Sequence, residues 1–278
     1  MSPDTLPLQQ LQIDGRTLTY REAGSGDTAV VLVHGWPTSS FLWRNVLPIV
    51  GREHRALAPD LFGFGASDKP TDATYDFEFM AGALLGFLDA LELDRIVLVG
   101  HDLGGPLTVR LALDHPGRLR SLVLLNTLIH MDYTTELLDD FIEALQTPGK
   151  RERFTSQETL EVIFRMGVGR EESATDEAVA GVTEPFATEE ARRALAKAGS
   201  ELETAGVDDL AARLSGLAVP LRVIYGEQDR LLTTVGEGMA RIKRELPDTE
   251  VTALPSAGHF LQEDEPERVG ELIAEFAR

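Results

Sequence analysis

The sequence predicts an α/β fold, in which helices cover both faces of a mostly parallel β-sheet and one helical segment is inserted into the chain. In residues 1–129 and 218–278, short apolar runs alternate with segments of helical periodicity, a pattern typical of parallel strands joined by helices. Residues 130–217 are charged, have helical periodicity and contain no strand-like run. We therefore predict a core domain, 1–129 and 218–278, with a helical cap, 130–217, inserted into it. Two independent domains are the alternative.

The first half of the core begins with a predicted hairpin, because Asp14-Gly15 separates two short strands. The apolar run A-V-V-L-V-H that ends at His34 predicts a strand buried on both faces. Ser39 or Ser40 is a candidate N-cap for a helix that continues to about Val50. The elements predicted in this half are the strands 11–13, 17–20, 29–34 and 55–59, and the helices 39–50 and 75–93.

The second half is built around the apolar strand 96–99, which ends abruptly at Gly100. The elements predicted after it are the helix 103–114, the strand 119–125 and, beyond the cap, the strands 221–225 and 250–254 and the helices 235–246 and 260–276. The two ends of the cap flank adjacent strands. We therefore expect the cap to cover the carboxyl edge of the sheet, where open α/β sheets bind their ligands.

The composition excludes several classes of partner. The net charge of -20 would repel nucleic acids and anionic membranes. The chain has no cysteine, and no group of His, Asp or Glu has the spacing of metal ligands. The glycine-rich loop 60–70 does not join a strand to a helix as a dinucleotide motif does, so we expect no cofactor. Without a signal peptide or a stretch of about 20 apolar residues, the expected location is the cytoplasm.

The residue that decides the predicted chemistry is Asp102. It lies in the sequence G-H-D-L-G at 100–104, directly after the buried strand and before a helical pattern. A strand, a sharp turn and a helix with a reactive side chain at the apex form a nucleophile elbow, usually written G-x-S-x-G. Here the apex residue is a carboxylate. His101, within the elbow, and His34, at a strand end, are interpreted as structural residues.

Two further loops should meet Asp102 above the sheet. The loop after the strand 221–225 offers Asp229, with Glu227 as its competitor; we favour Asp229 because it lies deeper in the loop. The loop after the strand 250–254 offers His259, which needs a carboxylate on its second nitrogen to fix the tautomer. A nucleophile, an acid and a histidine in this chain order are expected of an α/β-hydrolase. The sequence therefore predicts an α/β-hydrolase fold with these three candidate catalytic residues.

A carboxylate nucleophile indicates transfer of an alkyl group rather than an acyl group. Attack on an acyl carbon would give an unstable anhydride, whereas displacement at a saturated carbon gives an alkyl ester on the enzyme. His259 would then activate water to attack the ester carbonyl carbon. The backbone N–H groups of Leu103 and Trp36 would stabilise the resulting oxyanion. The predicted partner is a small hydrophobic organic substrate, either a haloalkane or an epoxide.

Several stretches resemble the haloalkane dehalogenases of the α/β-hydrolase superfamily. They are H-G-W-P-T-S-S at 34–40, A-P-D-L-F-G-F-G-A-S-D-K-P at 58–70, G-H-D-L-G-G at 100–105 and A-G-H-F-L-Q-E-D at 257–264. The resemblance implies that Asp102 is the nucleophile, His259 the base and Asp229 the acid. Some dehalogenases carry the acid after the preceding strand, where this chain has Asn126, and this difference supports Asp229.

The chain departs from that family where the departing halide is held. Dehalogenases place a Trp directly after the nucleophile, where this chain has Leu103, and add an Asn or a lid Trp as a second N–H donor. Trp36 is the only indole near the predicted site, so we expect it to be the sole side-chain donor to the halide. The residues expected to line the substrate pocket are Phe141, Phe164 and Asn126.

Two other functions stay open at this point. The motif H-G-W-P also resembles epoxide hydrolases, which use lid tyrosines to protonate the alkoxide; Tyr133 is the single tyrosine of the predicted cap. The second alternative is a ligand-binding protein that keeps the fold with little turnover. Fluoroacetate dehalogenases place an Arg after the nucleophile, so Leu103 argues against a haloacid substrate.

Overall fold

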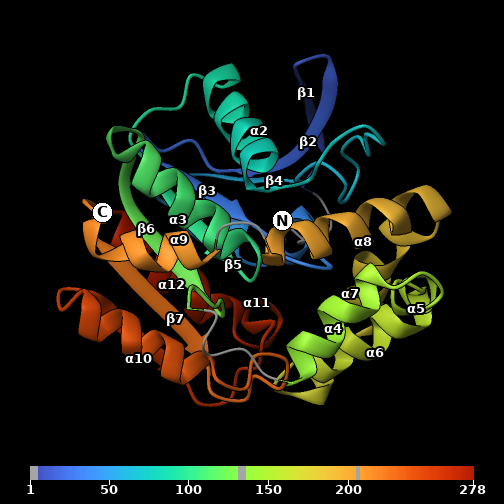
Figure 1. Ribbon diagram of the computed structural model, residues 1–278. Helices are drawn as coiled ribbons and strands as arrows, with labels where there is room; N and C mark the ends of the chain where they lie inside the picture. The colour runs from blue at the N-terminus through green and yellow to red at the C-terminus, as the bar shows by residue number, and fades with distance from the viewer. Residues whose placement is uncertain (1–5, 131–135, 205–206) are drawn as a thin grey trace.

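A central β-sheet runs through the computed structural model, which describes residues 6–130, 136–204 and 207–278 (Figure 1). Its strand order is β1-β2-β4-β3-β5-β6-β7-β8. The six strands from β4 to β8 in this order pair in parallel, and the hairpin β1–β2 adds two antiparallel strands at one edge. The mostly parallel sheet is therefore confirmed. The strands are β1 (Gln9–Ile13), β2 (Arg16–Ala23), β3 (Ala29–Val33), β4 (Arg55–Pro59), β5 (Ile96–His101), β6 (Leu119–Leu125), β7 (Leu221–Gly226) and β8 (Glu250–Leu254).

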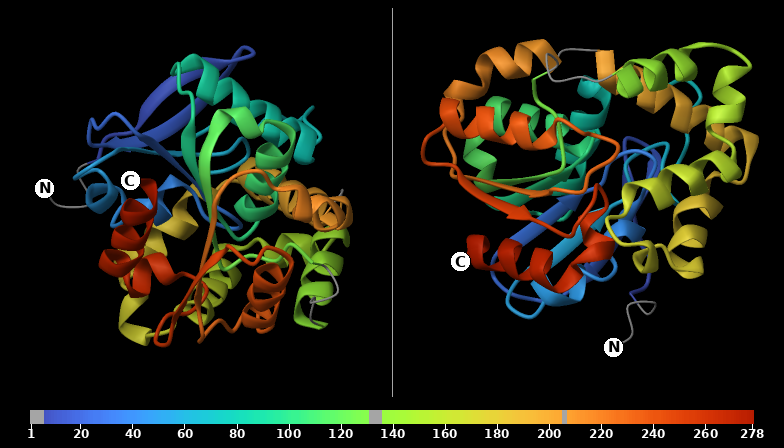
Figure 2. Two further views of the ribbon diagram at one scale, coloured as in Figure 1. Left: turned by 90° about the vertical axis from the view of Figure 1, so that its left-hand side faces the viewer. Right: turned by 90° about the horizontal axis from the view of Figure 1, so that it is seen from below.

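Helices cover both faces of this sheet, as Figures 1 and 2 show. One face packs against α2 (Phe77–Ala90), α3 (Gly104–Asp114) and α10 (Val235–Glu245). The opposite face packs against α1 (Leu47–Val50) and α12 (Pro266–Ala277). The remaining short helices of the core are the 3-10 helices η2 (Ser40–Trp43) and η3 (Pro116–Arg118) and the α-helix α11 (Leu261–Asp264).

Helical layers on both faces of the central strand β5 explain why residues 96–99 are all apolar. Ile96 and Leu98 pack in the cluster beneath α2 and α3, whereas Val97 and Val99 pack in the cluster beneath α1 and α12. None of the four has exposed surface. Successive side chains of a strand point to opposite faces of its sheet, so a strand between two helical layers has no solvent-facing position.

Between β6 and β7 the chain leaves the sheet, and the residues described there form helices and loops without a strand. The predicted helical character of the insertion is confirmed, while the domain limits stay a prediction. Helices α4 to α8 gather at one end of the sheet, and the last helix, α9, lies beside α3 instead (Figure 1). The helices are α4 (Glu136–Gln146), α5 (Lys150–Phe154), α6 (Gln157–Gly167), η5 (Glu171–Ser173), α7 (Asp176–Thr183), η6 (Glu184–Phe186), α8 (Glu189–Thr204), α9 (Val207–Arg213) and η7 (Leu214–Gly216).

Two helices predicted as continuous are interrupted in the structure. The predicted helix 39–50 is split into η2 and α1, because Pro48 has no N–H to donate and its ring would collide with the carbonyl four residues earlier. The predicted helix 260–276 is split into α11 and α12 at Glu265, whose backbone leaves the helical region (φ -137°, ψ 56°) before Pro266.

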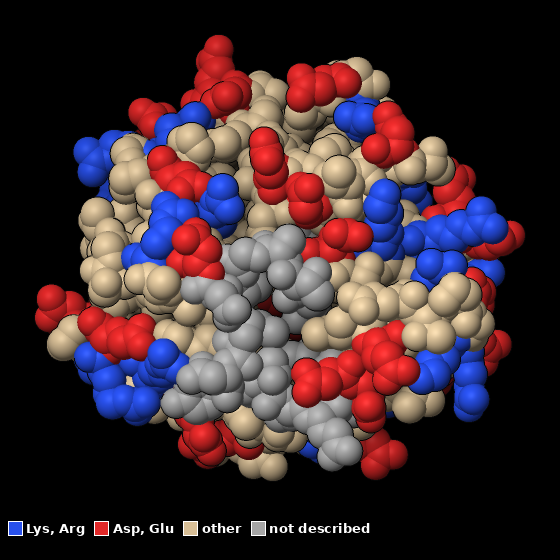
Figure 3. Space-filling model, in the orientation of Figure 1, with Lys and Arg blue, Asp and Glu red and all other residues tan. Residues whose placement is uncertain are grey.

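The surface is acidic without one dominant acidic patch on the face that Figure 3 shows. Asp and Glu side chains are spread over this face, and Lys and Arg side chains lie among them (Figure 3). No helix in the described residues is long and apolar enough to span a membrane.

Candidate active site

The elbow after β5 presents Asp102 at the apex of a tight turn. Its φ is 52°, in the left-handed region. A residue with a side chain is rarely found there, and the surrounding contacts must stabilise it. The backbone carbonyl of Asp102 accepts hydrogen bonds from the Gly105 N–H at 2.9 Å and from the Thr127 hydroxyl at 2.7 Å. A Cβ at Gly104 would lie 2.6 Å from the His34 carbonyl oxygen, so α3 can approach the end of β3 only with glycine there.

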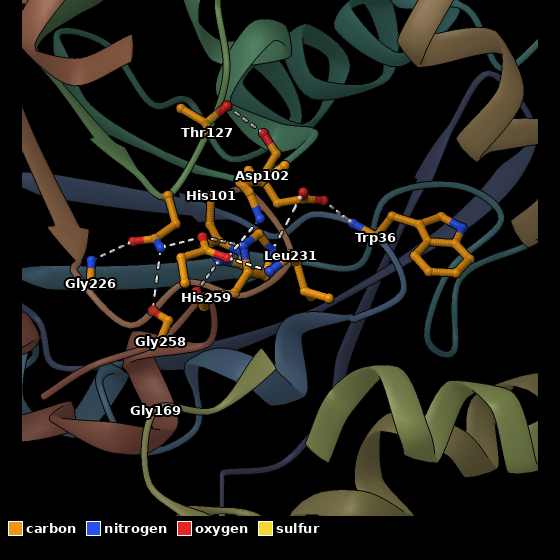
Figure 4. A network of polar contacts seen from close by, with 12 residues as sticks. Trp36, His101, Asp102, Thr127, Gly169, Gly226, Leu231, Gly258 and His259 are labelled. Atoms are coloured by element: carbon orange, nitrogen blue, oxygen red, sulfur yellow. Dashed lines mark hydrogen bonds and ion pairs between the residues drawn. The ribbon is translucent and has the colours of Figure 1, made fainter. Parts of the chain in front are cut away.

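The two oxygens of the Asp102 carboxylate have different partners (Figure 4). Oδ1 accepts the backbone N–H of Trp36 at 2.7 Å, and the nearby backbone amide of Leu103 contributes to lowering the pKa of this carboxyl. Oδ2 lies 3.5 Å from Nε2 of His259. One oxygen is therefore held by an amide donor, while the other faces the histidine.

His259, in the loop after β8, is held by a buried carboxylate. Its Nδ1 lies 2.9 Å from Oδ2 of Asp229, and both side chains are at most 2% exposed. The other oxygen of Asp229 accepts the backbone N–H groups of Leu231 at 2.9 Å and Leu232 at 2.8 Å. The competing carboxylate, Glu227, is exposed to solvent. The structure thus brings together the three side chains that the sequence pairs, with Asp229 rather than Glu227 beside the histidine.

Asn126 lies behind this pair rather than in the substrate pocket, so its predicted pocket role is wrong. Its amide N–H donates to Oδ2 of Asp229 at 2.7 Å and to the Gly258 carbonyl at 3.3 Å. Its side-chain oxygen accepts the Gly226 N–H at 2.9 Å. Asn126 ends β6 between β5 and β7, so a fully buried side chain there reaches neighbouring loops instead of the cavity.

The electrostatics of the site favour a charged His259 between two carboxylates. Burial alone would lower the pKa of His259, but the charge of Asp229 and the hydrogen bond with Asp102 raise it to about 10. Burial alone would raise the pKa of each carboxyl. The hydrogen bond and the charge of His259 hold the pKa of Asp102 below its ordinary value, and the same contacts lower that of Asp229. In this state both carboxyls are ionised at neutral pH.

Two further histidines support the backbone of the site. Burial and the charge of His259 lower the pKa of His101 to about 3, so His101 is neutral. Its Nε2 lies 3.0 Å from the His259 carbonyl oxygen and therefore carries the proton. Nε2 of His34 accepts the Leu61 N–H at 3.1 Å. These contacts agree with the interpretation of both residues as structural.

An apolar cavity of about 90 Å³ adjoins Asp102 and His259. Phe141 lines it, as predicted. Phe164 does not: it is fully buried against Phe260, at a ring distance of 5.0 Å, in a separate cluster. The face of α6 that meets the cavity carries Ile163 and Met166, which are three residues apart and so lie on the same side of the helix. The lining residues are Trp36, Asp102, Leu103, Phe141, Phe154, Ile163, Met166, Leu231, Leu232 and His259.

Sequence reasoning missed several of these contacts. Leu231 and Leu232 lie two and three residues after Asp229, so their nearness to the predicted acid is the available signal. Ile163 and Met166 are ordinary apolar residues of an amphipathic helix, and nothing in their spacing distinguishes a cavity lining from packing. Thr127 supports the elbow through a hydroxyl that no motif marks.

The indole of Trp36 points away from Asp102 (Figure 4). Its Nε1–H donates to the Leu195 carbonyl of α8 at 3.2 Å, and its ring meets that of Phe141 edge-on at 4.6 Å. The expectation that this indole donates to a halide is therefore wrong in this arrangement. Because the backbone N–H of Trp36 turns toward Asp102, the side chain projects to the opposite side, into the cap.

The donor expected for an epoxide reaction, Tyr133, lies outside the described residues. The described tyrosines, Tyr20, Tyr75 and Tyr225, do not line the cavity. In the same part of the chain, no three His, Cys, Asp or Glu side chains gather in a way that could hold a metal ion.

Comparisons with known proteins agree with this geometry. A family model described as alpha/beta hydrolase fold matches residues 28–266. A haloalkane dehalogenase of Mesorhizobium japonicum is 30% identical over 95% of this chain and 89% of that protein. A crystal structure of a haloalkane dehalogenase from Bradyrhizobium elkani matches with a TM-score of 0.86 at 28% identity, covering 98% and 97% of the two chains. The structure of the epoxide hydrolase CorEH, at 22% identity, shares the fold with a TM-score of 0.84 and covers 98% of both chains. The chain therefore belongs to the α/β-hydrolase fold family and is a hydrolase related to the haloalkane dehalogenases.

Proposed function

We propose that this protein hydrolyses small, uncharged haloalkanes through an ester formed on Asp102. The observation that carries the proposal is the position of the Asp102 carboxylate inside the amide cradle that other hydrolases of this fold reserve for a substrate oxyanion. Oδ1 occupies the cradle at 2.7 Å from the Trp36 N–H. Oδ2 lies 3.5 Å from Nε2 of His259, and both residues line the apolar cavity.

In the first proposed step, Oδ2 of Asp102 attacks the carbon that bears the halogen. A new carbon–oxygen bond forms as the carbon–halogen bond breaks, and the halide leaves with the bonding electron pair. The ester retains Oδ1 as its carbonyl oxygen in the amide cradle. Leu103 contributes an aliphatic side chain to the cavity, and the Trp36 indole N–H is engaged by Leu195, so neither side chain donates to the halide in this arrangement.

In the second proposed step, His259 takes a proton from water as the water oxygen attacks Cγ of the Asp102 ester. Negative charge develops on Oδ1, where the Trp36 and Leu103 amides stabilise it. Collapse of this intermediate breaks the bond to the alkyl oxygen. The alcohol leaves with the proton returned by His259. The remaining proton of the attacking water then passes from the Asp102 carboxyl to His259, which restores the Asp102 carboxylate, now carrying an oxygen from water, and the protonated histidine.

Formation of the ester also prepares His259 to act as a base. In the free enzyme two carboxylates raise its pKa to about 10, so it is protonated at neutral pH. Alkylation removes the charge of Asp102 and its hydrogen bond, which lowers the pKa of His259. The histidine then releases its proton and becomes a base only after the first step has taken place.

The cavity favours short, uncharged substrates. Apart from Asp102, His259 and the engaged Trp36 indole, its described lining residues are apolar, so a charged group would lose its hydration without compensation. An apolar cavity of ~150 Å³ holds benzene, so about 90 Å³ suits a chain of roughly three to five heavy atoms.

The test is a substrate panel. Halide release is measured with 1-bromopropane, 1-bromobutane and 1-bromohexane, and diol formation with short epoxides, for the wild type and Asp102→Ala. The proposal predicts halide from the short bromoalkanes, less from bromohexane, and none with Asp102→Ala. If no bromoalkane releases halide, the proposal is wrong; diol formation alone would indicate an epoxide hydrolase.

A further inference from the structure

Asp264, at the end of α11, is a buried carboxylate that the proposed steps do not use. It is 1% exposed. Its Oδ2 accepts the backbone N–H groups of Gly258 at 2.8 Å and Gly169 at 2.7 Å, and its Oδ1 accepts that of Arg170 at 3.1 Å. Gly258 directly precedes His259, whereas Gly169 and Arg170 belong to the linker after α6. One carboxylate therefore joins the histidine loop, residues 255–260, to the cap linker, residues 168–170.

The two segments also touch through their backbones. The Phe260 N–H, just after His259, donates to the Gly167 carbonyl at 3.1 Å. A Cβ at Gly258 would lie 2.4 Å from that same carbonyl oxygen and 2.5 Å from the Gly169 nitrogen, so the backbones meet with no room for a side chain. The His259 peptide is thus fixed to the cap on both sides of the histidine.

The cap linker is anchored at the acid loop as well. Arg230, next to Asp229, donates from its guanidinium to the Val168 carbonyl. The linker continues α6, whose Ile163 and Met166 line the cavity. The contacts of Asp264 therefore connect α6, which lines the cavity, to the loop that carries His259, the residue proposed to activate water.

We propose that Asp264 is a positioning residue that couples the cap linker to the histidine loop and holds His259 in place for hydrolysis of the Asp102 ester. This inference rests on the proposed function. Asp102 itself is held from the other side, by the Trp36 amide, the Thr127 hydroxyl and the elbow. Loss of the Asp264 contacts should therefore slow the step that needs His259 and spare the step that needs only Asp102.

The neighbouring residue offers a matched control. Glu263 is also a buried carboxylate of α11, but it pairs with both terminal nitrogens of Arg44, at 2.5 and 2.9 Å, and not with the histidine loop. Asp264→Asn and Glu263→Gln each replace a buried carboxylate by an amide. Both are expected to lower stability, but only the first removes an acceptor shared by the two segments.

The kinetic experiment measures the two steps separately, by rapid quench and mass spectrometry with 1-bromobutane. For Asp264→Asn we expect ester hydrolysis to fall about tenfold, the cost of one badly placed hydrogen-bonded group, and alkylation to stay within about threefold. The ester should then accumulate during turnover. For Glu263→Gln the ratio of the two rates should stay that of the wild type. Equal slowing of both steps by Asp264→Asn, or the same shift in Glu263→Gln, would overturn the proposal.

A second measurement needs no activity. In native-state hydrogen exchange of the wild type, the Gly169, Arg170 and Gly258 amides should share one opening free energy, because one carboxylate holds all three. In Asp264→Asn, exchange should rise in 168–170 and 255–260 together. Protection that differs more than about tenfold between the two segments would contradict the coupling. If His259→Ala forms no ester with any bromoalkane, the proposed function fails, and the exchange data still decide the coupling.

Discussion

Replacing Asp229 with Asn tests whether the second step depends on the orientation and tautomer of His259. In the wild type, Oδ1 of Asp229 accepts the two amides of Leu231 and Leu232, and Oδ2 accepts Asn126 and His259. The asparagine oxygen will keep the two amides, which leaves its NH2 group facing His259 and the Asn126 amide. The new NH2 group, a donor, then faces the N–H donors of Asn126 and His259, where Oδ2 of Asp229 is the acceptor in the wild type.

The consequence for the histidine follows from its two nitrogens. Nδ1 of His259, 2.9 Å from Asp229 Oδ2 in the wild type, would have to accept from the new amide and lose its proton. The neutral ring would then carry its proton on Nε2, the atom that must take a proton from water. For this change of tautomer we expect hydrolysis of the ester to fall by about 10³ to 10⁴-fold. Alkylation should fall by about tenfold or less, because Nε2–H still faces Asp102.

The assay is single-turnover kinetics with 1-bromobutane, in which the ester is followed by intact mass and the alcohol by gas chromatography. Glu227→Gln is the control, because it removes a carboxylate of the same loop that is exposed to solvent. The ester should build up to nearly one per molecule in Asp229→Asn and should not do so in Glu227→Gln. Hydrolysis by Asp229→Asn within tenfold of the wild type would refute this account of His259.

Three further predictions follow from single contacts. Trp36→Phe removes the indole hydrogen bond to Leu195; urea unfolding should show a free energy of unfolding lower by about 1 kcal/mol, and the rate of halide release should stay within about threefold of the wild type. A hundredfold loss of that rate would instead make the indole a donor to the leaving group. Gly104→Ala places a Cβ 2.6 Å from the His34 carbonyl; it should lower stability by about 1–3 kcal/mol and abolish ester formation, and a wild-type melting temperature would contradict the close packing of the elbow. The pKa of His259 is raised from 6.5 to about 10, so its contribution to stability is complete below pH 6.5 and is lost as the pH rises to about 10. The free energies of unfolding of the wild type and His259→Ala should therefore converge at high pH, and a difference that stays constant with pH would contradict the raised pKa.

The elements that the sequence predicts best are those fixed by local patterning. Residues 96–99 are all apolar because helices cover both faces of the sheet there, and the same rule identifies β3. The elbow could be found because a buried strand, a tight turn and a helix start are all visible in ten residues. The helices predicted at 39–50 and 260–276 have nearly the right limits but are interrupted near Pro48 and Pro266, because helical periodicity does not show a break in the backbone.

The site is less predictable where side-chain direction decides the outcome. The position of Trp36 near Asp102 follows from the sequence. The backbone conformation, which the sequence does not show, directs its amide to the carboxylate and its indole to α8. Phe164 and Met166 are equally apolar, and only the packing of α6 against the core determines which one reaches the cavity. The hydrogen bonds that turn Asn126 toward Asp229 join residues about a hundred positions apart, so local patterning does not show them.

The most direct test of the proposed chemistry is to trap the ester on Asp102. His259→Ala removes the proposed base and leaves the nucleophile and its amide cradle unchanged, so incubation with 1-bromobutane should stop after the first step. The account predicts one equivalent of bromide per protein, and a mass increase of one butyl group in place of hydrogen on the peptide that contains Asp102. No mass increase, or a butyl group attached at another residue, would contradict it.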